Sequence, residues 1–95
     1  MAIMSDTEVK AALGALAGWE LAGADIVKEY KFADFVAAIA FVNQLADRAE
    51  AANHHPDIDI RWNKVRLALS THSEGGLTSK DFALATEIEA LAGAA

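Results

Sequence analysis

With 95 residues, the chain is long enough for one domain, residues 1–95, that buries only about 60% of its unfolded surface. The absence of cysteine excludes both a disulfide framework and a thiolate metal site. A net charge of −6, with fourteen acidic residues against eight scattered basic ones, argues against a nucleic-acid-binding protein.

The distribution of apolar residues favours a soluble protein, and the absence of cysteine fits a reducing, cytoplasmic setting. The longest apolar run, residues 35–42, is far shorter than the roughly 20 residues of a membrane helix. Residues 1–10 lack the basic start and apolar middle of a signal peptide. Much of the 54% hydrophobic content is alanine, which buries little apolar area per residue. We therefore expect association between copies of the chain.

The first third of the chain predicts a helix and a hairpin. Ser5 and Glu8 form a Ser-x-x-Glu capping box, and Gly18 is placed to end the helix. Apolar residues follow the cap at helical spacing: Val9, Ala12, Leu13 and Leu16. Two strand-like pieces, residues 19–22 and 25–32, follow with Gly23 between them. In the second piece, Lys28 is the polar interruption of an otherwise apolar row.

A long helix is predicted over residues 33–52. Asp34 lies in its first turn, where the helix dipole favours a carboxylate. The expected inward stripe consists of Phe35, Ile39, Val42, Ala46 and Ala49. The helix should end near Asn53, because Pro56 disfavours helical backbone at His55.

A second hairpin and a last helix complete the predicted fold. Ile58, Ile60 and Trp62 form one apolar row, and Val65, Leu67 and Leu69 form another beyond an Asn63-Lys64 turn. A last helix begins at residues 78–81, with these side chains facing inward: Phe82, Ala85, Ile88, and Leu91 or Ala92. The order αββαββα predicts a single α+β domain, a four-stranded antiparallel sheet with three helices on one face.

Three histidines are the candidate site for proton transfer. His54 and His55 are adjacent after the long helix, and His72 follows the strand that returns from the second hairpin. That return could bring all three imidazoles into one cleft. Imidazole gives and takes protons near neutral pH, which is worth roughly 10²–10⁴-fold in rate for a well-placed group. A zinc site with an open position is the alternative for three imidazoles.

The spacing of these residues resembles the signature of active pterin-4a-carbinolamine dehydratases. The matching positions are Glu50, His54-His55-Pro56, Trp62, His72 and Asp81. The similarity extends from about residue 18 to 91 and includes Trp19, Lys31-Phe32-x-Asp34-Phe35, Leu69-Ser70-Thr71-His72 and Gly76-Leu77-Thr78. One departure follows the proline, where Asp57-Ile58-Asp59 stands and some relatives have an aromatic residue.

The resemblance implies a reaction and roles. Members of the family dehydrate 4a-hydroxytetrahydropterin to quinonoid dihydropterin, recycling the pterin after an aromatic amino acid hydroxylase has used it, with no metal or organic cofactor. The resemblance implies His54 and His72 as the main proton-transfer groups, with His55 binding and assisting. Which histidine is acid and which is base does not follow from sequence. The supporting or substrate-binding residues that it implies are Glu50, Pro56, Ser70, Thr71 and Asp81.

Several of these residues also have structural interpretations. Asp81 is placed to cap the last helix, and Glu50 to be a solvated helix residue. Trp19 and Trp62 are expected to pack rather than stack on a pterin, with Trp62 in the core. Gly75-Gly76 indicates turn geometry rather than a phosphate site. By family analogy we expect a homodimer or homotetramer. A non-catalytic binding, scaffolding or assembly module is the alternative function.

Overall fold

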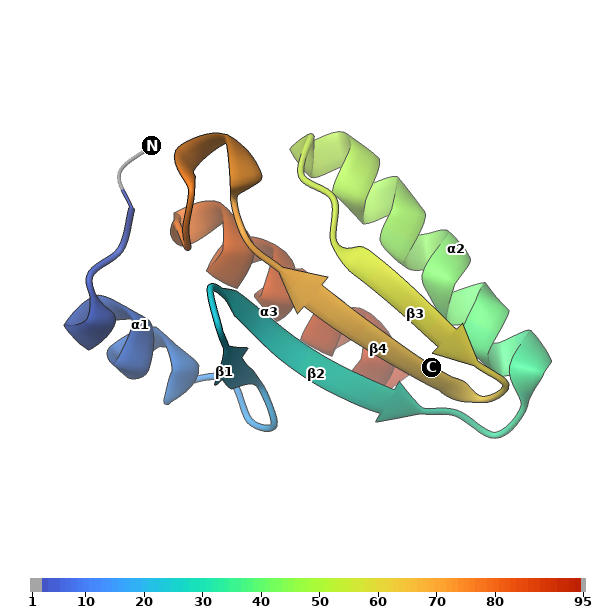
Figure 1. The fold of residues 1–95 in the computed structure, drawn as a ribbon. Coiled ribbons are helices and arrows are strands. Elements are labelled where there is room, and N and C mark those ends of the chain that lie inside the picture. Colours follow the sequence, from blue (N-terminus) through green and yellow to red (C-terminus); the bar gives the residue numbers. More distant parts are fainter. Residues whose placement is uncertain (1–2, 95) are drawn as a thin grey trace.

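The computed structural model describes residues 3–94, and its elements follow the predicted order with one addition. The elements are α1 (Asp6–Leu13), β1 (Glu20–Ala22), β2 (Asp25–Lys31), α2 (Phe35–Ala52), β3 (Asp57–Arg61), β4 (Lys64–Leu69), the 3₁₀ turn η1 (His72–Glu74) and α3 (Ser79–Ala94). The strands form one antiparallel sheet in the order β1-β2-β4-β3 (Figure 1). The α+β arrangement αββαββα is therefore confirmed, and η1 is the addition.

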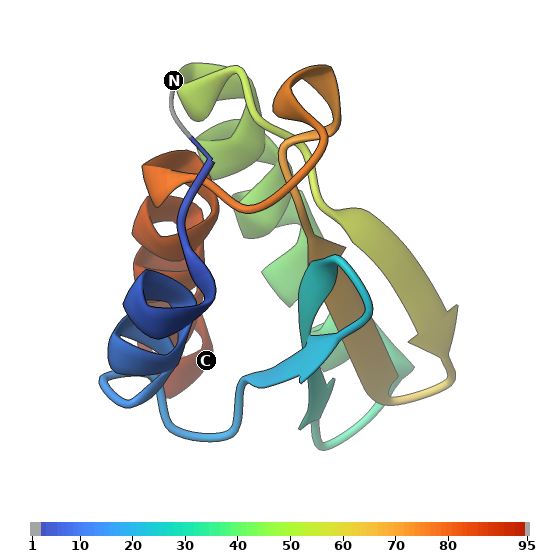
Figure 2. The same cartoon turned by 60° about the vertical axis from the view of Figure 1, so that its left-hand side comes forward.

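All three helices lie on the same side of the sheet, as Figure 2 shows, and the core lies between the two layers. The apolar row of β4 is confirmed as its inner row, because Val65, Leu67 and Leu69 are all fully buried. Ala85 and Ile88 of α3 are buried as predicted, together with Leu84, which the helical spacing had not indicated. An antiparallel sheet with one covered face explains the alternation along β4.

The capping box at the start of α1 is confirmed. The Ser5 hydroxyl accepts a hydrogen bond from the Glu8 N–H at 3.2 Å, and Glu8 Oε1 accepts one from the Ser5 N–H at 2.8 Å. The helix ends at Leu13, earlier than the predicted end at Gly18. Gly18 instead follows a turn with a φ of 82°, where a Cβ atom would lie 2.9 Å from Cε of Lys28.

The prediction of which face of α2 points inward is wrong. The buried residues are Ala38, Phe41, Leu45 and Ala49, of which only Ala49 was predicted. Phe35 is 50% exposed, and Asp34 is the N-cap, accepting from the Ala37 N–H at 2.8 Å. Because residues 35–42 are all apolar, helical spacing alone fits more than one inward face.

The turn of the second hairpin lies one residue earlier than predicted. Arg61 pairs with Lys64, so Trp62 and Asn63 are the two turn residues. Trp62 has a φ of 53° and is 67% exposed, which corrects its predicted place in the core. Asn63 takes the buried position, and its side-chain amide donates to the Phe32 carbonyl at 2.9 Å. This hydrogen bond ties the turn to the connection that leads into α2.

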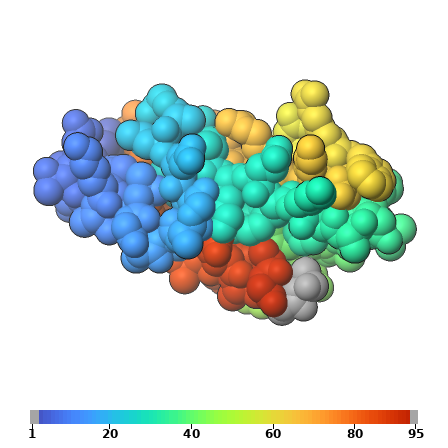
Figure 3. Space-filling model, turned by 90° about the horizontal axis from the view of Figure 1, so that it is seen from below, coloured from blue at the N-terminus to red at the C-terminus, as the bar shows by residue number. Residues whose placement is uncertain are grey.

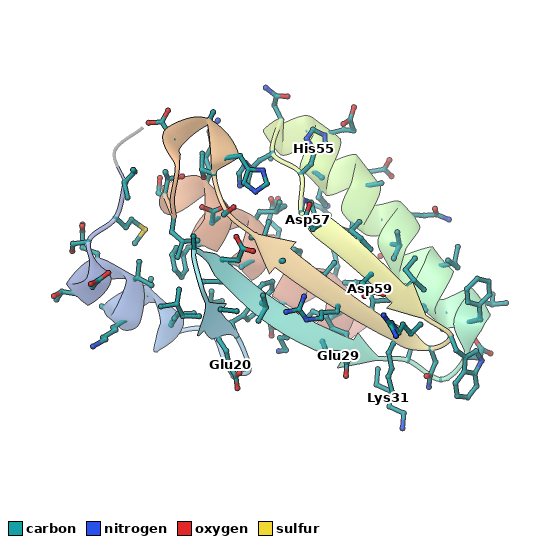
Figure 4. All side chains as sticks on the ribbon, in the orientation of Figure 1. Glu20, Glu29, Lys31, His55, Asp57 and Asp59 are labelled. Atoms are coloured by element: carbon teal, nitrogen blue, oxygen red, sulfur yellow. The ribbon has the colours of Figure 1, made fainter. Side chains whose placement is uncertain are left out.

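The opposite face of the sheet is charged rather than covered. Glu29 and Asp59 flank Arg66 on neighbouring strands, and all three side chains are exposed. Figure 4 shows Glu20, Glu29 and Asp59 among the side chains on the sheet. Within residues 3–94, no helix combines the length and the hydropathy that a membrane crossing requires.

A polar cluster lies where the C-terminal half of α3 meets the first hairpin, two segments that Figure 3 shows in contact. The Lys28 ammonium lies 2.5 Å from Glu89 Oε1, which accounts for the polar interruption in the inner row of β2. The Trp19 indole donates to the same oxygen at 3.0 Å, and the Tyr30 hydroxyl also donates to it. Trp19 is 4% exposed, so its predicted packing role is confirmed.

The cluster shifts two pKa values in opposite directions. Partial desolvation alone would raise the pKa of Glu89, but the hydrogen bonds from Lys28, Tyr30 and Trp19 outweigh it and hold that pKa below 4.5. Burial, the hydrogen bond to Glu89 and its negative charge raise the pKa of the Tyr30 phenol. The folded protein therefore favours a charged Glu89 and a neutral Tyr30.

We expect Glu89→Gln to weaken the acid sensitivity of the fold. Because the pKa of Glu89 is lower in the folded state, its contribution to stability is present above about pH 4.5 and is lost as the pH falls through the folded pKa. Urea unfolding between pH 7 and pH 3 should give a shallower decline for Glu89→Gln than for the wild type. Glu87→Gln is the control, since Glu87 lies on the same helix and pairs only loosely with Arg48 at 3.7 Å. Equal declines for both variants would contradict this role of Glu89.

Candidate active site

Two of the predicted histidines lie between the end of α2 and the start of β3. Asn53 has left-handed backbone, with φ of 49° and ψ of 43°, and forms the C-cap of α2. Pro56 disfavours helical backbone at the preceding residue. His54 and His55 therefore leave the helix in a non-helical connection, and the predicted helix end near Asn53 is confirmed.

The β3–β4 hairpin returns the chain to this connection. Its register pairs Asp57 with Ala68, so the segments just outside the ladder, residues 54–55 and 70–71, run side by side. His72 begins the turn η1 immediately afterwards. The out-and-back path expected from the sequence is therefore present (Figure 1).

A short closed loop holds His72. The Thr71 N–H donates to the Gly76 carbonyl at 3.0 Å, and the Gly75 N–H donates back to the Thr71 carbonyl at 3.0 Å. Gly75 has a φ of 76°, a backbone conformation that glycine adopts without steric cost. The glycine pair thus supplies turn geometry, as predicted.

The Asp81 carboxylate contacts both His54 and the backbone at the start of α3. The carboxylate is fully buried, and its Oδ1 lies 2.6 Å from Nε2 of His54. Its Oδ2 accepts hydrogen bonds from the Thr71 hydroxyl at 2.8 Å and from the Thr78 N–H at 2.9 Å. Because a carboxylate only accepts, His54 donates through Nε2, and Nδ1 is the acceptor nitrogen of the neutral ring. The predicted cap of the last helix is therefore present, and the same carboxylate contacts His54.

Glu50 pairs with His55 in a more open setting. Its Oε2 contacts Nε2 of His55, but the side chains are 77% and 56% exposed, respectively. His54, by contrast, is only 10% exposed. The two neighbouring imidazoles therefore each have a carboxylate partner, one buried and one solvated. Figure 4 shows His55 at the end of α2.

A polar pocket of about 330 Å³ collects most of the predicted site. Its volume is at the lower end of the range for small-molecule sites. All three histidines line it, with Ser70 and Thr71; the remaining lining residues, Asn53, Ser73 and Lys80, were not among the predicted site residues. Glu50, Pro56 and Asp81 do not line it. Asp81 contacts the lining residues His54 and Thr71 instead.

Lys80 is the notable omission from the sequence-based site. It lies in the first turn of α3, directly before Asp81, and that adjacency was the one available signal. A more apolar pocket of about 310 Å³ lies between α1 and the β1–β2 turn and contains no histidine. Among the described residues, no group of three histidine, aspartate or glutamate side chains is arranged to hold a metal ion.

The fold and this pocket define a class of protein: a small α+β domain with a histidine-lined polar pocket supported by a buried carboxylate. A sequence model described as "Pterin 4 alpha carbinolamine dehydratase" matches residues 2–91. The chain therefore belongs to the pterin-4-alpha-carbinolamine dehydratase family, as its sequence motifs had indicated.

Individual relatives agree with this assignment. A protein of Acidobacterium capsulatum, provisionally named a pterin-4-alpha-carbinolamine dehydratase, is 54% identical over 91 residues, which cover 96% of this chain and 99% of that protein. The crystal structure of a transcriptional coactivator/pterin dehydratase from Brucella melitensis superposes with a TM-score of 0.94 at 37% identity, covering 97% of this chain and 100% of that one. A pterin dehydratase-like protein identified as a RuBisCO assembly factor in the α-carboxysome matches with a TM-score of 0.65 at 25% identity, covering 79% and 87%.

Proposed function

We propose that the protein dehydrates 4a-hydroxytetrahydropterins, such as 4a-hydroxytetrahydrobiopterin, to quinonoid dihydropterin and water in the cytoplasm. The observation that carries this proposal is the convergence of three histidines on one polar pocket, with the buried Asp81 against His54. The family supplies the substrate class. Recycling of a pterin used by an aromatic amino acid hydroxylase is the corresponding role in the cell.

The reaction needs one acid and one base. The C4a–O bond breaks as the hydroxyl takes a proton and leaves as water. The electron pair of the adjacent ring nitrogen forms a C=N double bond, and a base takes the proton that this nitrogen gives up. Two imidazoles in different protonation states perform both transfers. After product release, the acid regains a proton from water and the base gives its proton up to water.

We assign the base to His54 and the acid to His72. Asp81 holds the Nε2–H of His54 and stabilises the imidazolium that forms when Nδ1 takes a proton. His72 lines the same pocket on a solvent-exposed turn, where it can regain a proton from water. His55, paired with the exposed Glu50, binds the pterin and assists. Ser70 and Thr71 offer hydroxyl groups to the polar edge of the ring.

The test of this proposal is turnover of freshly generated 4a-hydroxytetrahydropterin, followed by ultraviolet absorbance. Chelator-treated wild type should accelerate dehydration well beyond the rate in buffer, and added zinc should not increase the rate. Activity that disappears with chelator and returns with stoichiometric zinc would support the metal alternative instead. No acceleration by folded, chelator-treated protein would rule out the enzyme.

A binding or assembly role is the second candidate, favoured by the structural similarity to the RuBisCO assembly factor. A chain that acted only in assembly would not need three histidines on one pocket, and this chain retains them. The turnover assay separates the two functions, because an assembly module would bind a protein partner without dehydrating the pterin.

We also propose a homodimer or homotetramer. Apolar side chains on α2 and the hairpin turn remain uncovered, with Phe35, Val36 and Trp62 at 50%, 75% and 67% exposure. The strand β3 lies at one edge of the sheet, so its outer backbone groups can pair with another strand. Light scattering should give two or four times 10.1 kDa, whereas a 10.1 kDa species at micromolar concentration would exclude both assemblies.

A further inference from the structure

The pocket contains one cation that the dehydration does not use. Lys80 lines it from the first turn of α3, whereas His54 and His55 come from the α2–β3 connection and His72 from η1. Its side chain is exposed, and its ammonium forms no ion pair within the part of the chain that the structure describes. An ammonium has three donor hydrogens, so Lys80 is available to an incoming ligand.

The charges in the lining around Lys80 are unbalanced. No aspartate or glutamate lines the histidine pocket. Asp81 is engaged by His54 and Thr71, and Glu50 is engaged by His55. Glu74 follows the lining residue Ser73 in η1 but does not itself line the pocket. Three other pockets, beside α1, on the charged face of the sheet and beside β1, combine acidic and basic lining residues. A pocket lined by a lysine and no carboxylate therefore contrasts with these three pockets, in a chain with a net charge of −6.

We propose that Lys80 binds an anionic group on the side chain of the pterin, so that the site prefers pterins with a phosphate or carboxylate over pterins with a neutral side chain. This inference rests on the proposed function, because it takes the pterin ring to lie among the histidines. The neutral ring needs no cation. A substituent that extends from the ring toward α3 would reach the ammonium, with further N–H donors from the imidazoles beside it. Phosphate and carboxylate oxygens are the acceptors that form charge-assisted hydrogen bonds with lysine.

The test compares dissociation constants for three stable ligands, measured by calorimetry. The ligands are 7,8-dihydroneopterin phosphate, 7,8-dihydrofolate and the neutral 7,8-dihydrobiopterin. Wild type should bind at least one anionic ligand about 10-fold more tightly than the neutral one, since a charge-assisted hydrogen bond contributes that order of affinity. The two anionic ligands show whether phosphate or carboxylate is preferred. The preference should fall in high salt, because the site is open to solvent.

Lys80→Gln should reduce the ratio of neutral to anionic dissociation constants to about one. The ratio is the diagnostic quantity, since a general loss of pterin binding would change both constants alike. Lys64→Gln is the matched control, because Lys64 lies at the other end of β4 and does not line the pocket. It should leave the ratio unchanged.

A wild-type ratio near one, or a preference that survives in Lys80→Gln, would overturn the inference. Turnover of 4a-hydroxytetrahydropterin by the same wild-type preparation reports on the proposed function separately. Turnover without any anionic preference overturns only the role of Lys80. Loss of turnover together with failure to bind all three ligands overturns both.

Discussion

His54→Ala should lower kcat/KM for 4a-hydroxytetrahydropterin by roughly 10²–10⁴-fold, the range for removal of a general acid or base. The imidazole is nearly buried against Asp81, which fixes its donor nitrogen and its orientation. Water that enters the vacated space would be neither oriented nor of comparable basicity. The measurement is the absorbance assay on freshly generated substrate, with circular dichroism to establish that the variant is folded.

His55→Ala is the neighbouring comparison. His55 is 56% exposed and its carboxylate partner is more exposed still, so we expect a smaller loss than for His54→Ala. Asp81→Asn should lower the rate because it disturbs His54. The double variant, His54→Ala with Asp81→Asn, should therefore be little slower than His54→Ala alone. Full activity in His54→Ala, or additive losses in the double variant, would contradict the assignment of His54 and Asp81 as one unit.

The sequence predicted most of the fold because its local signals agree with one another. The capping box at Ser5, the alternation along β4 and the Asn53 end of α2 are each short-range patterns with a single physical interpretation. The antiparallel topology then follows from two hairpins joined by one long helix. Strand order required the tertiary structure, because β2 pairs with β4 across the whole length of α2.

Two errors arose because a local apolar pattern does not by itself determine which of its positions are buried. In α2 an unbroken apolar run fits several faces, and only contact with the sheet selects the face of Phe41 and Leu45. At the second hairpin, the alternation that includes Ile60 predicts a buried Trp62. The pairing of Arg61 with Lys64 places that tryptophan in the turn instead.

The candidate site was predictable where its residues are close in sequence or of a distinctive type. The histidines and the cap residue Asp81 satisfy that condition. Lys80 does not, because a lysine on a helix is usually solvated and only the tertiary structure shows that it lines the pocket. The same limit applies outside the site to Glu89, whose partners are revealed only by long-range contacts. Glu89 contacts Trp19, Lys28 and Tyr30, which lie 59 to 70 residues away in sequence.

Asp81→Ala should reduce the free energy of unfolding by about 2–4 kcal/mol, a large share of the roughly 5–15 kcal/mol of a small domain. The carboxylate is fully buried, and its loss leaves the Thr78 N–H at the start of α3 without its acceptor. The Thr71 hydroxyl retains one partner, Thr78 Oγ1 at 2.8 Å, which limits the loss. The substitution also removes the desolvation cost of burying a carboxylate, and this limits the loss of stability further. Urea unfolding at pH 7 measures the difference.

Asp81→Asn separates the two roles of this residue. The amide oxygen can still accept from Thr78 N–H and Thr71, so the stability loss should stay near 1 kcal/mol. The amide nitrogen, however, would donate toward His54 and force Nε2 to accept, which reverses the tautomer needed at Nδ1. We therefore expect a stable fold with low turnover. If Asp81→Asn were fully active, Asp81 would be a helix cap alone, and the buried hydrogen bond to His54 would be structural rather than catalytic.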